Sequence, residues 1–150
     1  MNEPVSAILD DKGRRVETTT AGATVAEAVG AMNRARIGSL VVVDGERPVG
    51  IFTERDVLTR VVAEGRDPDA TQVGEVMTRE LAVIGPSTRV HQVMAIMTEK
   101  RYRHLPVVSD GRLAGMISIG DVTRWSIKDQ QNTIDDLLSY IAGEYPYPKR

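Results

Sequence analysis

The sequence predicts an α+β fold made of two copies of one small unit, in which helices cover small sheets. Two stretches, residues 37–57 and 102–122, align without a gap at an offset of 65 residues. Before each stretch the apolar residues follow helical spacing, and within each stretch two β-branched runs flank an Asp-Gly turn. Because an internal repeat constrains an architecture more strongly than local propensity does, the predicted order is strand, helix, strand, strand, helix, occurring twice.

In the first unit, apolar spacing predicts each element in turn. Residues 16–20 supply a leading strand, and Thr24 with Glu27 forms a capping box at the start of the first helix. Two short runs that flank the turn around Asp44-Gly45 form a hairpin, namely residues 40–43 and 49–52. A second helix opens after Thr53 and carries four apolar residues on one face: Val57, Leu58, Val61 and Val62.

The second unit repeats this pattern. Residues 81–84 lead, a helix opens at Val90, and a hairpin joins residues 105–108 to residues 114–117. A further helix beyond Trp125 carries an apolar stripe that needs a partner, formed by Ile134, Leu137, Leu138 and Ile141. The predicted divisions are the first repeat with its N-terminal segment, a polar linker, the second repeat, and a C-terminal helix and tail: residues 1–66, 67–72, 73–128 and 129–150.

Composition limits the classes of protein to which this chain can belong. Its 150 residues are 41% hydrophobic and 27% charged, with 19 Lys and Arg against 21 Asp and Glu, which is typical of a globular protein. The absence of cysteine excludes disulfides, thiolate zinc sites and thiol catalysis, and predicts a cytoplasmic location. The longest aliphatic run, residues 40–43, is far short of the roughly 20 residues that cross a bilayer, so no membrane association is expected.

A hydroxyl, two residues and then a carboxylate occur at the same place in both copies, as Thr53-x-x-Asp56 and Ser118-x-x-Asp121. Helix capping alone would explain both pairs, and a cap residue is worth about 0.5–2 kcal/mol. The second arm of a capping box prefers Glu or Gln, however, and both copies use Asp. An exposed carboxylate at such a place can accept both hydroxyls of a ribose while the Ser or Thr hydroxyl faces a phosphate. The two roles can coexist.

Cations precede the hairpin of the second copy. The helix dipole accounts for Lys100 and Arg101, but Arg103 and His104 follow the predicted helix end and are candidate phosphate contacts. The first copy has Gly38 and Ser39 at these positions. The sequence therefore predicts two unequal sites, with the stronger one at Asp121.

Known catalytic motifs are absent from the sequence. There is no G-x-S-x-G nucleophile elbow, no phosphate-binding P-loop, no G-x-G-x-x-G and no H-E-x-x-H. His91 and His104 are the only histidines, and they lack the spacing of metal ligands. We therefore predict a protein without enzymatic activity, catalytic cofactor or metal.

The repeated motifs resemble those of a tandem pair of CBS domains, the regulatory unit also called a Bateman module. The resemblance covers roughly residues 5–128 and rests on the segments GIFTERDV, GMISIGDV, YRHLPVV and VGEVMT. The segment TIDDLLSYIAG is similar to the tail of free-standing bacterial members. The resemblance implies a pseudo-two-fold pair whose clefts bind an adenosyl ligand such as AMP, ADP, ATP, NAD or S-adenosylmethionine, with AMP and ATP as first candidates. It also implies a disc-like homodimer formed through the helices.

The resemblance further implies a role for each candidate site residue. Asp56 and Asp121 would hold ribose, and four residues would contact phosphate: Thr53, Ser118, Arg103 and His104. The adenine base would lie between strand residues of the two hairpins, with the leading strand closing over it near Thr18 or Val83. The strand residues are Ile37, Gly38, Ser39, Leu40, Tyr102, Leu105 and Pro106.

Three functions follow from these observations. The leading one is a non-catalytic nucleotide sensor that signals to an unidentified protein by conformational change. The alternative is a ligand-independent interaction or oligomerisation module whose hydroxyl-Asp motifs are only caps, in which Asp121→Ala lowers stability and leaves partner binding unchanged. Nucleic-acid binding through residues 100–104 is disfavoured by the sequence pI of about 5.7, because contacting phosphates needs a basic surface.

Overall fold

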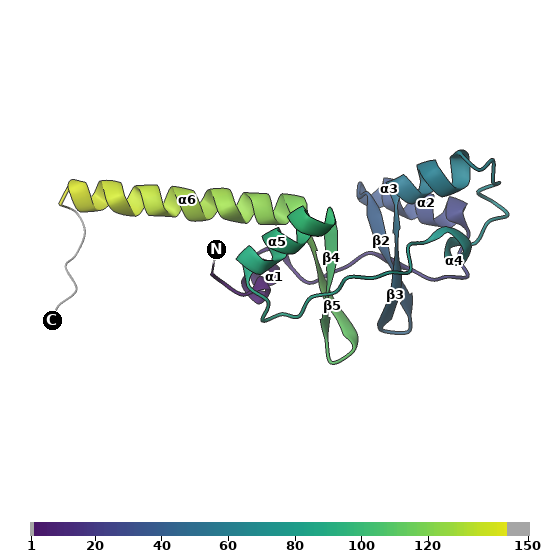
Figure 1. Cartoon of the computed structure of the whole chain (residues 1–150), viewed down its shortest axis with the longest axis horizontal. Helices are drawn as coiled ribbons and strands as arrows, with labels where there is room; N and C mark the ends of the chain where they lie inside the picture. The colour runs from purple at the N-terminus through teal and green to yellow at the C-terminus, as the bar shows by residue number, and fades with distance from the viewer. Residues whose placement is uncertain (1, 144–150) are drawn as a thin grey trace.

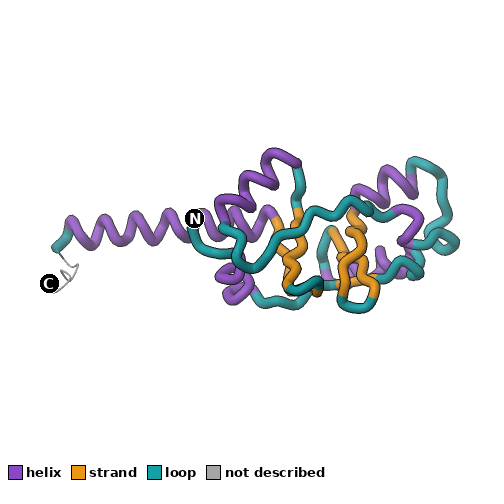
Figure 2. Tube along the Cα trace, turned by 60° about the horizontal axis from the view of Figure 1, so that its bottom comes forward, coloured by secondary structure: helices purple, strands orange, loops and turns teal. Residues whose placement is uncertain are grey.

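Two α+β units, each centred on a β-hairpin, make up the molecule, and the computed structural model describes residues 2–143 of it (Figure 1). The hairpins lie next to each other in the middle, and helices lie on their outer sides (Figure 2). The first unit contains β1 (Thr18–Thr19), α2 (Val25–Ala35), β2 (Ser39–Asp44), β3 (Arg47–Thr53), α3 (Glu54–Asp56) and the π-helix η1 (Val57–Val62). The other elements are α1 (Val5–Lys12), α4 (Val73–Val76), α5 (Val90–Lys100), β4 (His104–Ser109), β5 (Arg112–Ser118) and α6 (Ile119–Ile141). The predicted α+β fold of two repeated units is confirmed.

The two hairpins share one register. Ser39 pairs with Thr53 at the open end of the first, and His104 pairs with Ser118 at the open end of the second. Each hairpin also has a register irregularity at the same place, between Val42 and Val43 in the first and between Val107 and Val108 in the second. Both hydroxyl residues of the repeated motif therefore end a strand directly opposite the residue that begins its neighbour.

The predicted leading strands differ in length from the observed ones. In the first unit β1 pairs in parallel with β2, through two residues. In the second unit the prediction of a strand over residues 81–84 is wrong, because only Ile84 forms a bridge, with Val107. The segment turns at Pro86-Ser87, and proline cannot donate a ladder hydrogen bond, so the pairing does not extend beyond Ile84 toward the C-terminus.

The helix after Thr53 exists, but its faces were predicted incorrectly. After the single turn of α3 the chain continues as the π-helix η1, whose hydrogen bonds join residues five apart. Val61 is fully buried, whereas Leu58 and Val62 are each 64% exposed. The wider π turn no longer keeps all the apolar residues on the side that faces the sheet.

Each unit has its own apolar core, and each core is completed by a helix from elsewhere in the chain. In the first core Val25, Leu40 and Phe52 pack with Val73 and Val76 of α4. In the second, the partners of the hairpin and α5 include the α1 residues Val5, Ile8 and Leu9. The N-terminal segment, which we placed with the first repeat, thus packs against the second.

Helix α6 is one continuous helix that runs out of the second unit and projects beyond it (Figure 1). It spans the predicted boundary between residues 128 and 129. Its projecting part exposes the predicted apolar stripe, from Ile134, which is 49% exposed, to Ile141, which is 79% exposed. The predicted tail from residue 144 onwards lies outside the described residues. None of the helices within residues 2–143 combines the length and hydropathy of a membrane-spanning segment.

Candidate functional site

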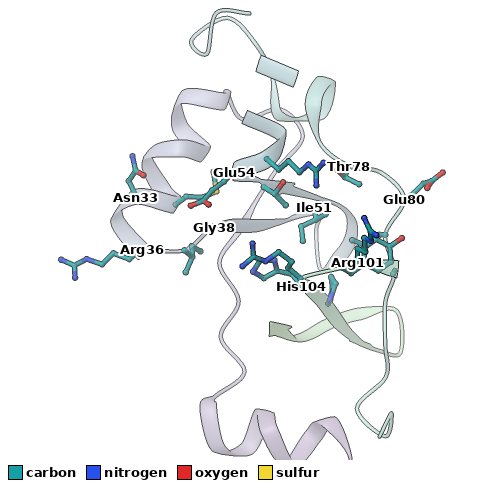
Figure 3. A pocket seen from close by; sticks show the side chains of 18 residues that line it. Asn33, Arg36, Gly38, Ile51, Glu54, Thr78, Glu80, Arg101 and His104 are labelled. Carbon is teal, nitrogen blue, oxygen red and sulfur yellow. The ribbon is translucent and has the colours of Figure 1, made fainter. Parts of the chain in front are cut away.

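A cavity of about 820 Å³ opens between the two units and takes its walls from both (Figure 3). The first unit contributes Thr53 at the end of β3 and Ile51 two residues earlier, and the second contributes Arg103 and His104 at the start of β4. Figure 3 shows Ile51 and His104 pointing into the cavity, whereas Arg36 and Glu80 point away from it. Side chains that are about 50 residues apart in the sequence therefore share one site.

The cavity wall at β3 presents two hydroxyls in front of a carboxylate, one from Thr53 of the first repeat and one from Thr78 of the second. The Thr53 Oγ1 accepts a hydrogen bond from the Asp56 backbone N–H at 3.2 Å, and Thr53 N–H donates to Asp56 Oδ2 at 3.0 Å. Thr78 is held beside them because its backbone pairs with Ile51 of β3. Its hydroxyl donates to Asp56 Oδ1 at 3.1 Å. Thr53 and Thr78 line the cavity, and Asp56, which is 5% exposed, lies directly behind them.

The wall from the second unit is basic, and backbone conformation and hydrogen bonding position its residues. Arg101 ends α5 in the left-handed conformation, with φ 59°, which turns the next residues toward the cavity. The Arg103 carbonyl then accepts a hydrogen bond from Ile119 N–H at 2.8 Å. Burial lowers the pKa of His104 and the neighbouring Arg103 charge lowers it further, so this imidazole is neutral near pH 7.

Charge is distributed unevenly over the cavity. Four arginines line it against two glutamates: Arg36, Arg55, Arg101 and Arg103 against Glu54 and Glu80. The Glu54 carboxyl group lies close to Gly38, where an added Cβ would meet its Cδ at 3.2 Å. By the repeat offset Gly38 corresponds to Arg103. Glu54 would repel an anionic group and Arg103 would attract one, while Arg36 and Arg55 add positive charge on the side of the first unit.

The remainder of the lining is largely apolar. It includes Ile37, Ile51, Tyr102 and Pro106, which come from the strand ends of both hairpins. Protein sites for small molecules typically combine such an apolar lining with a few placed polar groups, and they measure about 300–1,000 Å³. The volume of this cavity falls in that range, but its lining is more polar, since more than half of the lining residues are polar or charged.

Around Asp121, the second copy of the motif is arranged differently. Its Oδ2 accepts hydrogen bonds from Lys12 Nζ at 2.6 Å and from the Ser118 N–H at 2.8 Å, and its Oδ1 accepts one from Arg124 at 2.7 Å. Burial alone would raise the pKa of the Asp121 carboxyl, but the hydrogen bonds from Lys12 and Ser118 outweigh it, and the pKa is lowered. Asp121 does not line the cavity.

Both motifs are complete capping boxes, which corrects one expectation from the sequence. Asp56 and Asp121 each accept the N–H of their cap residue, and each donates its own N–H to that residue's hydroxyl. We expected exposed carboxylates because Asp is shorter than the Glu that such boxes prefer. In the structure Asp is long enough to reach the cap N–H, and the residues Asp56 and Asp121 are only 5% and 7% exposed.

Comparison with known proteins decides the family. The family model described as CBS domain matches residues 5–63 and 73–128. The chain belongs to the CBS domain family. It is a pair of CBS domains, which is a regulatory module.

Relatives of this CBS pair are CBS-domain proteins. The mitochondrial CBS domain-containing protein CBSX3 of Arabidopsis thaliana is 38% identical, over 94% of this chain and 73% of its own length. A solved CBS-domain containing protein from Agrobacterium tumefaciens is 40% identical with a TM-score of 0.77, over 82% of this chain and 98% of that one. A CBS domain protein from Pyrobaculum aerophilum, complexed with AMP, is 28% identical with a TM-score of 0.69, over 79% of this chain and 88% of that one.

The CBS pair brings about half of the predicted site residues to the cavity. Seven line it: Ile37, Gly38, Thr53, Tyr102, Arg103, His104 and Pro106. Leu40 and Leu105 are buried in the two cores instead. Leu105 alternates along β4 with His104 and Pro106, which line the cavity. The others outside the lining are Thr18, Ser39, Asp56, Val83, Ser118 and Asp121.

Several lining residues were missed, although some had a signal in the sequence. Arg36 and Arg101 are identical at the repeat offset, and both take the left-handed conformation that ends their helices. Thr78 lies in the quoted VGEVMT segment, but only its pairing with β3 brings it to Asp56. Within residues 2–143 no group of three His, Cys, Asp or Glu side chains could hold a metal ion.

Acid is expected to destabilise this CBS pair through Asp121. The unfolded chain would hold a proton on this carboxyl more readily than the folded chain, because the folded-state pKa is lowered. The stabilisation is therefore present above the ordinary value of 3.8 and is lost as the pH falls through and below that value. Urea unfolding at pH 6 and pH 3 should show a smaller loss of stability for Asp121→Asn than for the wild type. An equal loss in both proteins would contradict the assignment.

Proposed function

We propose that this CBS pair is a non-catalytic sensor that binds an adenine nucleotide in the cavity between its units. One observation carries the proposal: the cavity combines hydroxyls backed by a carboxylate on one wall, a basic pair on the other, and apolar residues between them. These are the groups that recognise ribose, phosphate and base respectively. The AMP complex of the similar Pyrobaculum aerophilum protein supports AMP as the first ligand to test.

The charged residues of the cavity favour one orientation of the nucleotide. Its phosphate would lie at Arg103 and His104, on the basic wall of the cavity. Its ribose would lie at Thr53 and Thr78, where rotation of the Thr78 side chain gives a hydroxyl access to Asp56. His104 would take up a proton beside the phosphate, since a neighbouring anion favours the charged imidazole.

Because the cavity walls belong to different units, a nucleotide would stabilise one relative placement of the two. Such a ligand shifts a conformational equilibrium only by its difference in affinity between the two states. We propose that a partner protein binds the pair in only one of these two arrangements.

The exposed apolar residues Leu58 and Val62 on η1, together with the stripe on α6, support the predicted homodimer. The cytoplasmic location stays a prediction.

AMP is expected to raise the melting temperature of the protein. A ligand at 100 times its Kd adds about 2.7 kcal/mol to the free energy of unfolding. Thermal unfolding should be followed with AMP, ATP, NAD and S-adenosylmethionine at millimolar concentration, with 2′-deoxy-AMP as the matched control for the ribose contact. The proposal requires a shift with at least one of the four ligands and a smaller shift with the deoxy analogue.

A ligand-independent interaction module is the second candidate, and one observation favours it. Both aspartates are already used as helix caps and are almost fully buried. This candidate predicts no thermal shift with any adenosyl ligand. It also predicts that Asp56→Ala lowers stability without changing association between copies of the chain or with a partner.

A further inference from the structure

Lys12, at the end of α1, contacts Asp121 of the second hydroxyl-Asp motif. Its Nζ donates to Asp121 Oδ2 at 2.6 Å and to the Met116 carbonyl at 2.7 Å. Asp121 is 109 residues away along the chain, so no helix-internal pairing accounts for the contact. Asp121 corresponds by the repeat to Asp56, the proposed ribose contact. The Lys12 ammonium therefore lies where the hydroxyls of a ribose would lie at the second motif.

Helix α1 holds Lys12 in this position. Val5, Ile8 and Leu9 are buried in the core of the second unit. Leu9 lies so close to β5 that a Cβ on Gly115 would be 2.7 Å from its Cδ2. The helix ends just after Lys12 at Gly13, which has a φ of 99° and donates its N–H to the Leu9 carbonyl. The Lys12 side chain is 32% exposed, and its two hydrogen bonds hold the ammonium against the second unit.

Among residues 2–143, no cation lies as close to the carboxylate of the first motif. Asp56 receives the Thr78 hydroxyl at 3.1 Å, and the nearest ion-pair nitrogen, from Arg60, is 3.7 Å away. A ribose hydroxyl can take the place of a neutral threonine hydroxyl at little cost. To reach Asp121 it would have to displace an ammonium from a buried carboxylate, which leaves a charge without its partner.

We propose that the Lys12 ammonium permanently occupies the second motif and prevents a nucleotide from binding there. Each chain then has one nucleotide site, in the cavity at Thr53. The inference rests on the function proposed for that cavity. Asp121 Oδ2 is shared by Lys12 and the Ser118 N–H, and Oδ1 is taken by Arg124. Arg124 is 74% exposed and can swing into solvent, so Lys12 is the contact that decides whether the motif is open.

Calorimetric titration with AMP tests the inference. The wild type is expected to bind one AMP per chain, and Lys12→Met, which keeps the apolar stem of the side chain, is expected to bind two. Lys128→Met is the matched control, because it removes an equally charged but 61% exposed lysine on α6, and it should bind one. Two sites in the wild type, one unchanged site in Lys12→Met, or loss of binding in Lys12→Met would each overturn the inference.

These outcomes separate the inference from the proposed function. If the wild type binds no AMP but Lys12→Met binds one, the function of the cavity is wrong and the closure by Lys12 is supported. If neither protein binds AMP, both fail.

Amine acetylation of the wild type, read by mass spectrometry, tests the contact without a variant. Lys12 should react about tenfold more slowly than the exposed Lys100, because its Nζ is engaged by a buried carboxylate. AMP should not speed its reaction, and Asp121→Asn should. Equal rates for Lys12 and Lys100 in the wild type would overturn the inference.

Discussion

Replacing Arg103 with Gly and His104 with Ser together is expected to weaken AMP binding by about 100-fold or more. The double variant gives the second unit the residues that the first unit has at the same positions, Gly38 and Ser39. Each hydrogen bond to a charged group contributes about 1.5–3 kcal/mol, so loss of two such contacts to phosphate exceeds a factor of 100. Calorimetric titration of the variant and the wild type gives the two Kd values.

Lys100→Ala is the matched control for this experiment. It removes a positive charge three residues from Arg103, at the end of α5, from a side chain that is exposed and does not line the cavity. Its AMP affinity should stay within about threefold of the wild type, since an exposed charge at this distance is strongly screened. If the control weakens binding as much as the double variant does, the effect comes from overall charge and the assignment of the phosphate site is wrong.

Replacing Phe52 with alanine is expected to lower the free energy of unfolding by about 3–5 kcal/mol. Phe52 is fully buried in the first core, between α2 and the residues of α4. The substitution removes a large apolar surface and leaves a cavity that the surrounding side chains can fill only in part. Because domains of this size are stable by about 5–15 kcal/mol, much of the stability of the protein would be lost. Urea unfolding followed by circular dichroism measures the change.

Two further variants show what the result for Phe52 means. Ile117 corresponds to Phe52 at the repeat offset and is also fully buried, so Ile117→Ala should cost about 2–5 kcal/mol. Val83 is 48% exposed, and Val83→Ala should change stability by less than about 0.5 kcal/mol. A cost below about 1 kcal/mol for Phe52→Ala would show that the first core is not packed as described.

Local patterns in the sequence were enough to predict most elements of the fold. The Thr24–Glu27 capping box, with Glu27 N–H to Thr24 Oγ1 at 3.1 Å, follows from residues three apart. The hairpins follow from short β-branched runs around an Asp-Gly turn, and the repeat shows that both units share them. The position of α1 could not be predicted in this way, because its packing against the second unit depends on contacts between residues far apart in the sequence. The π-helix η1 has no signal in the sequence that we can identify.

The sequence predicted which residues form the candidate site better than it predicted how they are arranged. Arg103 and His104 were predicted as candidate phosphate contacts because the helix dipole explains them less well than Lys100 and Arg101, and both line the cavity. We expected them to serve Asp121 of their own unit. The structure places them in one cavity with Thr53 of the first unit, while His104 still pairs with Ser118 of its own hairpin. The prediction of a stronger site at Asp121 also could not foresee Lys12, which the fold brings from the other end of the chain.

A crystal structure of the protein grown with AMP would test the central claim most directly, namely that the two units share one nucleotide site. The claim predicts AMP in the cavity, with ribose oxygens within hydrogen-bond distance of Thr53 or Thr78 and phosphate oxygens at Arg103 and His104. Lys12 should remain on Asp121. AMP bound at Asp121 with Lys12 displaced, or a cavity that stays empty at saturating AMP, would contradict it.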